Sequence, residues 1–460
     1  MKLLPSKHLL PFLLLIHFVL LLSTVFTLWP EMVVYPYLFN NSFKLYQDLI
    51  IPYPPYLVMA LGMFTKLFGY NQINFKLLTI FVVILIDLII FRLSGKIFKN
   101  KKIAVINTAF FAILSIPFGV NGLWFDLFQT PFILLAVYFL LFSRHKKNIL
   151  ISSIFLSCAI LIKQQALWLI PLFFVISLKK PFNSNKNLKV VKDFVAPLLI
   201  SVAITILLVV TISDFDNFIT WAVILPFFKS SSMPGYVLLP SLRQLITAAS
   251  LFLFFTPFLI NISPKQRVMV YVAFYALVFA YPRFDYFHLI PSLAVLSLVA
   301  GKVLTSIKLK PLSLAPIVLL IPLLAYQVRY YQNNLKPQTR FFENGVIEVS
   351  QKLKEISSPQ DRFYIQNGPD QVLALSGRLP IKPWADEFPW YLESNDLQEK
   401  IVEKLNDQQP KYVIVKPYSG DQEFALGSYR PKQIADYLDQ NYHFVQSLNK
   451  ELILKQINEK

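Results

Sequence analysis

At residues 45–56 the sequence reads Leu45-Tyr46-Gln47-Asp48-Leu49-Ile50-Ile51-Pro52-Tyr53-Pro54-Pro55-Tyr56. This stretch follows the first long apolar segment, in a loop that is rich in Tyr, Trp and Pro. Asp48 is one of only two acidic residues between Trp29 and Pro52, and the other is Glu31. A carboxylate beside aromatic side chains just outside a membrane can act on a lipid-linked substrate. The alternative is a solvated loop acid near the start of a helix, where carboxylates are common.

The composition is that of a membrane protein. Hydrophobic residues make up 55% of the 460 residues, and the mean hydropathy is +0.53, which is too apolar for an ordinary soluble chain. The formal net charge is +18, but most basic residues lie in short loops between apolar runs. This placement indicates membrane topology rather than nucleic-acid binding. The single cysteine, Cys158, excludes an intramolecular disulfide and a cysteine-based metal site.

Apolar runs recur along the first 328 residues. A membrane helix needs about 20 apolar residues, and several of the runs are somewhat shorter. Residues 54–69 are predicted to form a short helix along the membrane interface. About eleven runs are predicted to span the membrane: 8–28, 75–93, 103–120, 127–142, 149–162, 166–178, 194–212, 244–262, 268–280, 289–303 and 312–326.

The basic residues predict the orientation of these spans. Lys2 and Lys7 precede the first run, and every turn that this assignment places in the cytoplasm carries Lys or Arg. The positive-inside rule therefore predicts a multi-pass protein of the cytoplasmic membrane with a cytoplasmic N-terminus. An odd number of spans places the C-terminus outside. Residues 1–28 lack a small-residue cleavage site, which favours an uncleaved first helix over a signal peptide.

The composition changes at Arg329, after which no spanning run occurs. Short buried strands are predicted at 363–366 and 411–415, amphipathic helices at 396–405 and 431–441, and a closing hairpin from 444–448 and 451–455. The expected fold class is a polytopic α-helical membrane protein with a C-terminal extracytoplasmic α/β domain. Its predicted domains are residues 1–328, with an outer loop at 29–74, and residues 329–460.

Ionisable side chains gather at the predicted outer ends of the helices. They come from four separate outer turns and comprise Asp48, Asp126, Lys163, Arg283, Asp285 and His288. Because charged residues are expensive within a membrane, such positions are candidates for function. The cations suit the phosphate oxygens of an anionic lipid-linked donor. A carboxylate suits removal of a proton from an attacking hydroxyl group.

Each of these residues also has a structural alternative. Lys163 could extend to the outer headgroups, and Asp126 could cap the following helix. Arg283 and Asp285 could pair with each other and stabilise their turn. His288 could be a hydrogen-bonded interfacial residue without a role in chemistry.

Three further residues within the spans are interpreted as structural. Asp87 lies toward the cytoplasmic end of its span and is predicted to pair with a basic residue there, such as Arg92. His17 is too isolated to form a metal site. Cys158 is interpreted as a small packing residue.

Several of these segments together resemble bacterial GT-C glycosyltransferases related to the protein O-mannosyltransferases and the lipid A aminoarabinose transferase, a group like glycosyltransferase family 39. The resemblance extends over the whole architecture and depends on the order and spacing of several motifs. The segments that carry it are residues 45–48, 53–56 and 67–69, then Ile160-Leu161-Ile162-Lys163-Gln164-Gln165, then Tyr281-Pro282-Arg283 and Phe287-His288-Leu289-Ile290-Pro291.

The resemblance implies an inverting membrane glycosyltransferase that uses a sugar on a polyprenyl phosphate and acts outside the cytoplasmic membrane. It implies that Asp48 is the catalytic carboxylate and that Lys163 and Arg283 face the lipid phosphate. Our site prediction adds five residues from the outer turns. Asp126 is a second catalytic candidate, His288 a phosphate-binding residue, and Glu31, Asp285 and Tyr46 supporting residues.

Several questions stay open at this point. The first loop lacks the adjacent Asp-Glu pair of protein O-mannosyltransferases, so the acceptor could be a glycan, a lipid or a protein. The sequence identifies no certain cofactor, and Asp48 and Asp126 could share a divalent cation. The alternative functions are a flippase for a lipid-linked saccharide and a noncatalytic scaffold. A transporter predicts internal repeats and charges near the midplane. A cavity that is lined by Asp48 and opens to both the outer leaflet and the outside favours the transferase.

Overall fold

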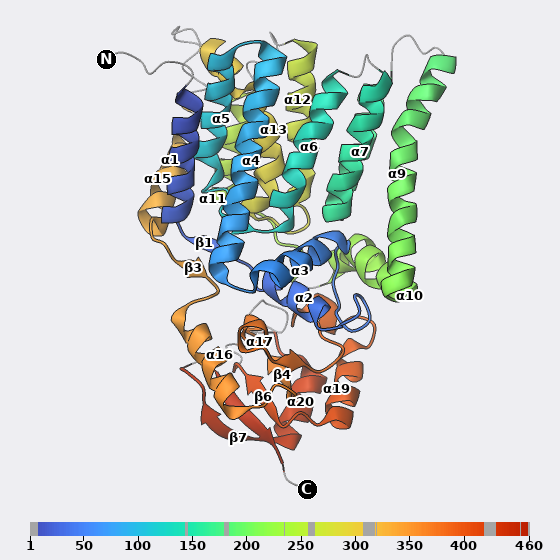
Figure 1. Ribbon diagram of the computed structural model, residues 1–460, viewed down its shortest axis with the longest axis vertical. Helices are drawn as coiled ribbons and strands as arrows, with labels where there is room; N and C mark the ends of the chain where they lie inside the picture. Colours follow the sequence, from blue (N-terminus) through green and yellow to red (C-terminus); the bar gives the residue numbers. More distant parts are fainter. Residues whose placement is uncertain are drawn as a thin grey trace. The chain divides into compact units, whose positions relative to one another are not determined.

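The computed structural model describes residues 8–142, 146–178, 184–233, 235–255, 263–306, 318, 320–417, 429–450 and 452–458 (Figure 1). The chain divides into two compact units. The first unit comprises Met1–Thr27, Lys76–Ile204 and Leu238–Gln338, and the second comprises Leu28–Phe75, Thr205–Val237 and Thr339–Lys460. The second unit therefore combines the Asp48 loop with the C-terminal region, which are far apart in sequence. The domain boundary predicted at residues 328 and 329 is not tested by this division and stays a prediction.

Helices form almost all of the first unit, as its long apolar runs predict. Among the described residues, three helical segments are long and apolar enough to cross a membrane, and they span Gln72–Phe98, Leu188–Ile212 and Tyr286–Thr305. The helices that belong wholly or mainly to this unit are α1 Leu9–Ser23, α4 Gln72–Phe98, α5 Lys101–Ser115, α6 Phe125–Leu141, α7 Lys146–Ile162, η1 Gln164–Trp168, α8 Leu169–Ser177, α9 Ser184–Ile212, α11 Leu242–Leu253, α12 Pro264–Tyr275, η5 Ala276–Ala280, η6 Tyr286–Leu289, α13 Ile290–Ser306 and α15 Ile321–Asn334.

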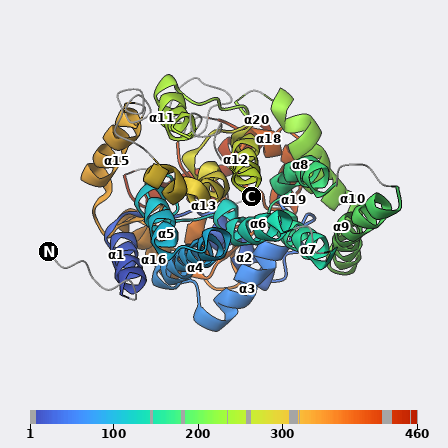
Figure 2. The same ribbon diagram turned by 90° about the horizontal axis from the view of Figure 1, so that it is seen from above.

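Helix α13 lies at the centre of the first unit, beside α5, α6 and α12 (Figure 2). Its close approach to α5 requires a glycine. A Cβ atom at Gly301 would lie 2.8 Å from both Asn107 Oδ1 and the carbonyl oxygen of Ile103. The Gly301 N–H instead donates to Asn107 Oδ1 across 2.5 Å, and Asn107 Nδ2 donates to the carbonyl oxygen of Leu298 across 2.6 Å. Small residues and buried polar contacts of this kind join helices within membranes.

Two predictions for the first unit are wrong in detail. Helix α1 ends at Ser23 and is followed by strand β1, Phe26–Leu28, so the helix is shorter than the predicted run of 8–28. Asp87 does not pair with Arg92. Its carboxylate lies 2.6 Å from His17 Nδ1, and both side chains are fully buried. Residues five positions apart lie on different faces of a helix, so Asp87 faces α1 rather than Arg92.

The span predicted at 103–120 is likewise too long, because α5 ends at Ser115, and the other span predictions agree with helices of similar bounds where the structure describes them. Part of the predicted span at 312–326 and the end of the one at 244–262 lie outside the described residues. The count of about eleven spans stays a prediction.

The second unit contains a mixed five-stranded sheet in the order β5-β4-β6-β8-β7. Strand β4 pairs in parallel with β5 and β6, and the antiparallel hairpin of β7 and β8 completes the sheet against β6. The strands predicted at 363–366 and 411–415 are confirmed as β4 and β6, and the predicted closing hairpin is confirmed as β7 and β8. The strand bounds are β4 Arg362–Gln366, β5 Leu379–Pro380, β6 Tyr412–Val415, β7 Tyr442–Ser447 and β8 Ile453–Ile457.

Helices lie beside this sheet (Figure 1). Helix α19 buries Leu397, Ile401 and Leu405, which are spaced four residues apart, so the amphipathic helix predicted at 396–405 is confirmed. Helix α20 confirms the helix predicted at 431–441. The helical bounds are α16 Asn344–Ile356, α17 Gln371–Ser376, α18 Pro389–Leu392, α19 Leu397–Gln408 and α20 Lys432–Asn441. The short strand β3 Thr339–Arg340 also belongs to this unit, whereas the short strand β2 Gly122–Leu123 belongs to the first unit.

The N-terminal part of the second unit contains two packed helices, α2 Glu31–Asn40 and α3 Tyr56–Phe68. Asn40 joins them, because its Nδ2 donates to the carbonyl oxygen of Gly62 across 2.9 Å. The helix predicted at 54–69 is confirmed as α3, whereas α2 was not predicted. The other helical segments of this unit are α10 Phe215–Phe218, the π-helical η2 Ile219–Lys229 and η3 Ser230–Ser232.

Candidate functional site

Asp48 lies in a tight loop of the second unit that is held by its own backbone. The N–H groups of Asp48 and Leu49 both donate to the carbonyl oxygen of Lys44, across 2.8 and 3.0 Å. The Tyr46 N–H donates to the carbonyl oxygen of Leu49 across 2.7 Å. Tyr46 has a φ of 65°, in the left-handed region that a residue with a Cβ seldom adopts. Such strain persists only where surrounding contacts fix the backbone, and it is concentrated at functional sites.

Tyr46 supplies those surrounding contacts. Its side chain is fully buried, and its hydroxyl donates to the carbonyl oxygen of Tyr53 across 2.9 Å. Its ring packs edge-on against Phe218, with 5.1 Å between ring centroids. Burial raises the pKa of the Tyr46 phenol well above its ordinary value, so the hydroxyl stays protonated. These contacts agree with a supporting role in shaping the loop.

The carboxylate of Asp48 is paired with a lysine from the C-terminal region. Lys382 Nζ lies 2.7 Å from Asp48 Oδ2, and the Lys44 N–H donates to the same oxygen across 3.1 Å. The Asp48 side chain is 18% exposed, so it is reachable without being freely solvated. Lys382 was not predicted as a site residue, because 334 positions separate it from Asp48 in the chain.

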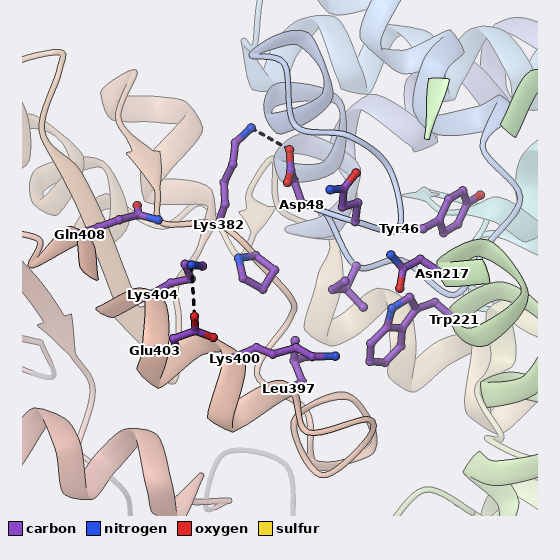
Figure 3. A pocket seen from close by; sticks show the side chains of 13 residues that line it. Tyr46, Asp48, Asn217, Trp221, Lys382, Leu397, Lys400, Glu403, Lys404 and Gln408 are labelled. Carbon is purple, nitrogen blue, oxygen red and sulfur yellow. Dashed lines mark hydrogen bonds and ion pairs between the residues drawn. The ribbon is translucent and has the colours of Figure 1, made fainter. Parts of the chain in front are cut away.

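A cavity of about 390 Å³ opens beside this pair (Figure 3). Its charged lining residues are the carboxylates Asp48 and Glu403 and the cations Lys382, Lys400 and Lys404. In Figure 3, Asp48 and Lys382 point toward each other at one side, and Glu403 and Lys404 from α19 form a second pair at 3.5 Å. This volume is within the range of small-ligand sites, and its mixed charges suit a polar ligand.

The first unit contains a second cluster of predicted site residues. Lys163 Nζ lies 2.6 Å from Asp126 Oδ2, and His288 Nδ1 lies 3.0 Å from the same oxygen. Gln129 Nε2 donates to the other carboxylate oxygen across 3.0 Å. Asp126 is fully buried, Lys163 is 2% exposed and His288 is 9% exposed. Buried charges persist where they are paired and hydrogen-bonded, as they are here.

This cluster decides between the structural alternatives for two of its residues. Lys163 does not extend to headgroups, because its ammonium is buried against Asp126. Asp126 does not cap α6, since the N-cap residue is Trp124 and no side chain caps that helix. The three residues come from the start of α6, the turn after α7, and η6. The sequence predicted only that these three residues share a membrane face, and the structure brings their side chains into contact. Their roles stay predictions.

Arg283 and Asp285 lie in the loop that leads to His288. The Leu238 N–H donates to the carbonyl oxygen of Pro282 across 3.0 Å, and the Phe284 N–H donates to that of Leu238 across 2.7 Å, so the backbone around Arg283 is fixed. The carbonyl oxygen of Asp285 accepts the His288 N–H across 3.2 Å. Asp285 therefore helps to begin the turn that places His288 near Asp126.

Glu31 belongs to a cluster of largely buried acids in the second unit. Its other members are Asp370, Asp386 and Glu387, which the sequence reading missed because they look like ordinary acids of a polar region. Burial raises the pKa of Glu31 and of Glu387 to about 7. Burial and then the charges of Glu387 and Glu31 raise the pKa of Asp370 to about 8. Protonation of such acids near neutral pH relieves their repulsion.

Tyrosines of the second unit contact these acids. The Tyr35 hydroxyl donates to Asp386, and the Tyr364 hydroxyl donates to Glu387. Within the described ranges, no group of three or more His, Cys, Asp or Glu side chains is placed to hold a metal ion. A divalent cation shared by Asp48 and Asp126, which belong to different units, stays a prediction.

Comparison with known proteins gives one clear result. No model of a known protein family matches the sequence, and no curated protein matches it. The chain is similar to the crystal structure of ArnT from Cupriavidus metallidurans bound to undecaprenyl phosphate, with a TM-score of 0.67 and 13% identity over 98% of this chain and 97% of that chain. The apo state of the same protein gives a TM-score of 0.63 with the same identity and coverage.

At 13% identity the likeness establishes the fold alone, and it does so over nearly the full length of both chains. ArnT is a lipid A aminoarabinose transferase of the GT-C type. The resemblance that the sequence motifs predicted is confirmed at this level. This chain therefore has the fold of ArnT, a GT-C-type membrane glycosyltransferase.

Proposed function

We propose that this protein is a membrane glycosyltransferase, which moves a sugar from a polyprenyl-phosphate donor to an acceptor on the outer side of the cytoplasmic membrane. The observation that carries the proposal is the position of Asp48. In a chain with the ArnT fold, a partly exposed carboxylate lines a cavity of about 390 Å³. The ArnT structure that shares this fold contains undecaprenyl phosphate, which supports a polyprenyl-phosphate donor here.

The proposed reaction is an inverting displacement. The hydroxyl oxygen of the acceptor attacks the anomeric carbon of the sugar and forms the new glycosidic bond. The bond between that carbon and the phosphate oxygen breaks, and the polyprenyl phosphate leaves with the electron pair. Asp48 takes the hydroxyl proton as a general base, a role that typically contributes about 10²–10⁴-fold to a rate.

Cationic residues of the first unit are proposed to hold the donor phosphate. Lys163, Arg283 and His288 are the candidates, because ammonium, guanidinium and imidazole groups bind phosphate oxygens through charge-assisted hydrogen bonds. Asp126 is the second candidate for the base. Its carboxylate already accepts hydrogen bonds from Lys163 and Gln129, so we expect its main effect to be fixing the Lys163 ammonium.

The finer features of the architecture belong to the same proposal. They are about eleven spans, a cytoplasmic N-terminus, and an extracytoplasmic α/β domain at residues 329–460. Basic residues in the predicted cytoplasmic turns support the orientation. The acceptor stays open among glycan, lipid and protein.

A transfer assay tests the proposal. Purified protein in nanodiscs is incubated with a panel of polyprenyl-phosphate sugars, each radiolabelled in the sugar, together with a membrane and cell-envelope extract as acceptor. We expect one labelled sugar to leave its lipid for an acceptor in the wild type, and to stay on the lipid with Asp48→Asn. The assay is run with and without EDTA, so that a metal requirement is measured directly. If no label leaves any donor with the wild-type protein, the proposed activity is wrong.

A further inference from the structure

The segment Lys382–Trp384 of the C-terminal region packs along the Asp48 loop. The Trp384 N–H donates to the carbonyl oxygen of Asp48 across 2.8 Å, and the Ile50 N–H donates to the carbonyl oxygen of Trp384 across 2.9 Å. These two bonds lie on either side of Leu49, which forms a parallel bridge with Trp384. The backbone that carries the Asp48 side chain is therefore fixed by a segment more than 300 residues away in sequence.

The ammonium group of Lys382 is held in one place by the loop itself. It donates to Asp48 Oδ2 across 2.7 Å and to the carbonyl oxygen of Ser42 across 3.0 Å. It also lies 4.5 Å from the centroid of the Phe43 ring, within the range of a cation–π interaction. Three contacts on one ammonium leave it little freedom, although the side chain is 37% exposed.

These contacts give the two carboxylate oxygens of Asp48 different surroundings. Oδ2 accepts hydrogen bonds from Lys382 Nζ and from the Lys44 N–H. Among the described residues, no donor bonds to Oδ1. Asp48 also lines the cavity, so Oδ1 is the oxygen that an entering hydroxyl group can meet.

We propose that Lys382 is a positioning residue for Asp48. It holds Oδ2 and thereby keeps Oδ1 free and oriented for the proton of the acceptor hydroxyl. Residues 382–384 of the C-terminal region accordingly belong to the site and contribute to its function. This inference rests on the proposed function, in which Asp48 is the general base.

A positioning role for Lys382 predicts how kcat and KM change when its ammonium group is removed. A misplacement of about 1 Å in a catalytic group can lower a rate by roughly 10²-fold. Loss of the Lys382 ammonium should lower kcat by about 10–10²-fold and leave the KM for the donor unchanged, because Lys382 is not proposed to bind the donor. A purely structural role would instead lower the amount of folded protein and leave the kcat of the folded fraction unchanged.

Two variants measure this effect with the labelled donor that the panel identifies. In Lys382→Met we expect the drop in kcat, and in Lys382→Arg, which keeps a cation, a smaller one. Lys455→Met is the matched control, because Lys455 forms an ion pair of the same 2.7 Å length with Asp439 in the same unit and does not line the cavity. Its kcat should equal that of the wild type.

Chemical rescue separates positioning from folding. Cys158 is the single cysteine, so Lys382→Cys in a Cys158→Ser background has one thiol, at a position where the native side chain is partly exposed. Alkylation with 2-bromoethylamine adds an amine at nearly the length of lysine. We expect the unmodified variant to be slow and the alkylated one to recover most of the wild-type kcat in the same folded preparation.

The outcomes distinguish the two proposals. The positioning role is overturned if Lys382→Met has the wild-type kcat, or if alkylation does not restore the kcat of Lys382→Cys. In either case an inactive Asp48→Asn variant still supports Asp48 as the base. A fully active Asp48→Asn variant overturns the proposed base itself. If Lys382→Met does not fold, the comparison of alkylated with unmodified Lys382→Cys decides the question.

Discussion

The Lys163 ammonium donates a hydrogen bond to the Asp126 carboxylate across 2.6 Å, and both side chains are almost completely buried. His288 contacts the same carboxylate oxygen at 3.0 Å. Removing one partner of such a pair leaves the other charge buried without compensation, which costs about 3–5 kcal/mol. The cluster therefore contributes to the stability of the first unit whatever its role in transfer.

The first prediction follows from this pair. Asp126→Asn and Lys163→Met should each lower the free energy of unfolding by about 3–5 kcal/mol, and the double variant should lose less than the sum. Thermal unfolding in detergent measures the effect. Lys455→Met removes a partly exposed pair and should change stability by about 1 kcal/mol or less. Single variants as stable as this control would show that the buried pair is not formed.

The second prediction concerns the donor phosphate. Arg283→Ala should weaken the binding of undecaprenyl phosphate by roughly 10–10²-fold, because a charge-assisted hydrogen bond contributes about 1.5–3 kcal/mol. Arg283→Lys should also bind more weakly, since an ammonium lacks the planar fork of a guanidinium. The dissociation constant is measured by titrating the lipid into protein in nanodiscs. Unchanged affinity in a folded Arg283→Ala variant would remove this residue from the site.

The sequence predicted the parts of the structure that depend on local pattern. The long helices α4 and α13 follow from apolar runs of spanning length. The topology predicted that Asp126, Lys163 and His288 share the outer face, because charged residues stand out in an apolar chain and each can be assigned to a face. Their direct contact was not predicted.

Features that depend on distant contacts were not predictable in this way. Lys382 lies 334 positions from Asp48, and His17 lies 70 positions from Asp87, so no periodicity connects them. Helix α2 was missed because Pro36 and its tyrosines are typical of a loop. The acids near Glu31 were missed because burial, and not residue type, distinguishes them from surface acids.

The third prediction is topological. A tag in the turn at residues 99–100, between α4 and α5, should be cytoplasmic, and a tag after Lys460 should be external. The physical reason is the concentration of Lys and Arg in turns assigned to the cytoplasm. Labelling of intact cells with a membrane-impermeant reagent checks both positions. A cytoplasmic C-terminus would contradict both the predicted number of spans and the placement of the site outside the membrane.

The fourth prediction concerns the acidic cluster of Glu31, Asp370, Asp386 and Glu387. Burial raises the pKa of these acids in the folded state, to about 7 for Glu31 and Glu387 and about 8 for Asp370. Between their unfolded and folded values, the folded state binds more protons than the unfolded state. The free energy of unfolding should therefore fall as the pH rises from about 5 to about 8.

Thermal unfolding at pH 6 and at pH 8.5 measures this effect, and the midpoint should be higher at pH 6. Asp370→Asn removes an acid whose pKa is raised to about 8 by burial and by the charges of Glu387 and Glu31, so it should reduce the difference between the two midpoints. The control is Asp436→Asn, an exposed acid of α20 that pairs with Arg430 at the surface. A midpoint that rises with pH in the wild type would show that these acids are not buried together.

The last prediction concerns Asp48 itself. Asp48→Asn should lower sugar transfer by about 10²–10⁴-fold, because an amide cannot accept the proton that a general base removes. The protein should stay folded, since Asn has the same size and its side-chain oxygen can still accept from Lys382 and from the Lys44 N–H. Transfer from the labelled donor and the thermal midpoint are measured on the same preparation.

Two other carboxylates serve as comparisons for this variant. Glu31→Gln should transfer at a near-normal rate, because Glu31 belongs to the acidic cluster whose members affect stability. If Glu31→Gln is inactive and Asp48→Asn is active, the base is the other acid of the first loop. If only Asp126→Asn loses transfer per folded molecule, the base lies in the buried cluster of the first unit. Normal transfer in all three variants would exclude a carboxylate base at these positions, and the positioning role of Lys382 would then have no group to act upon.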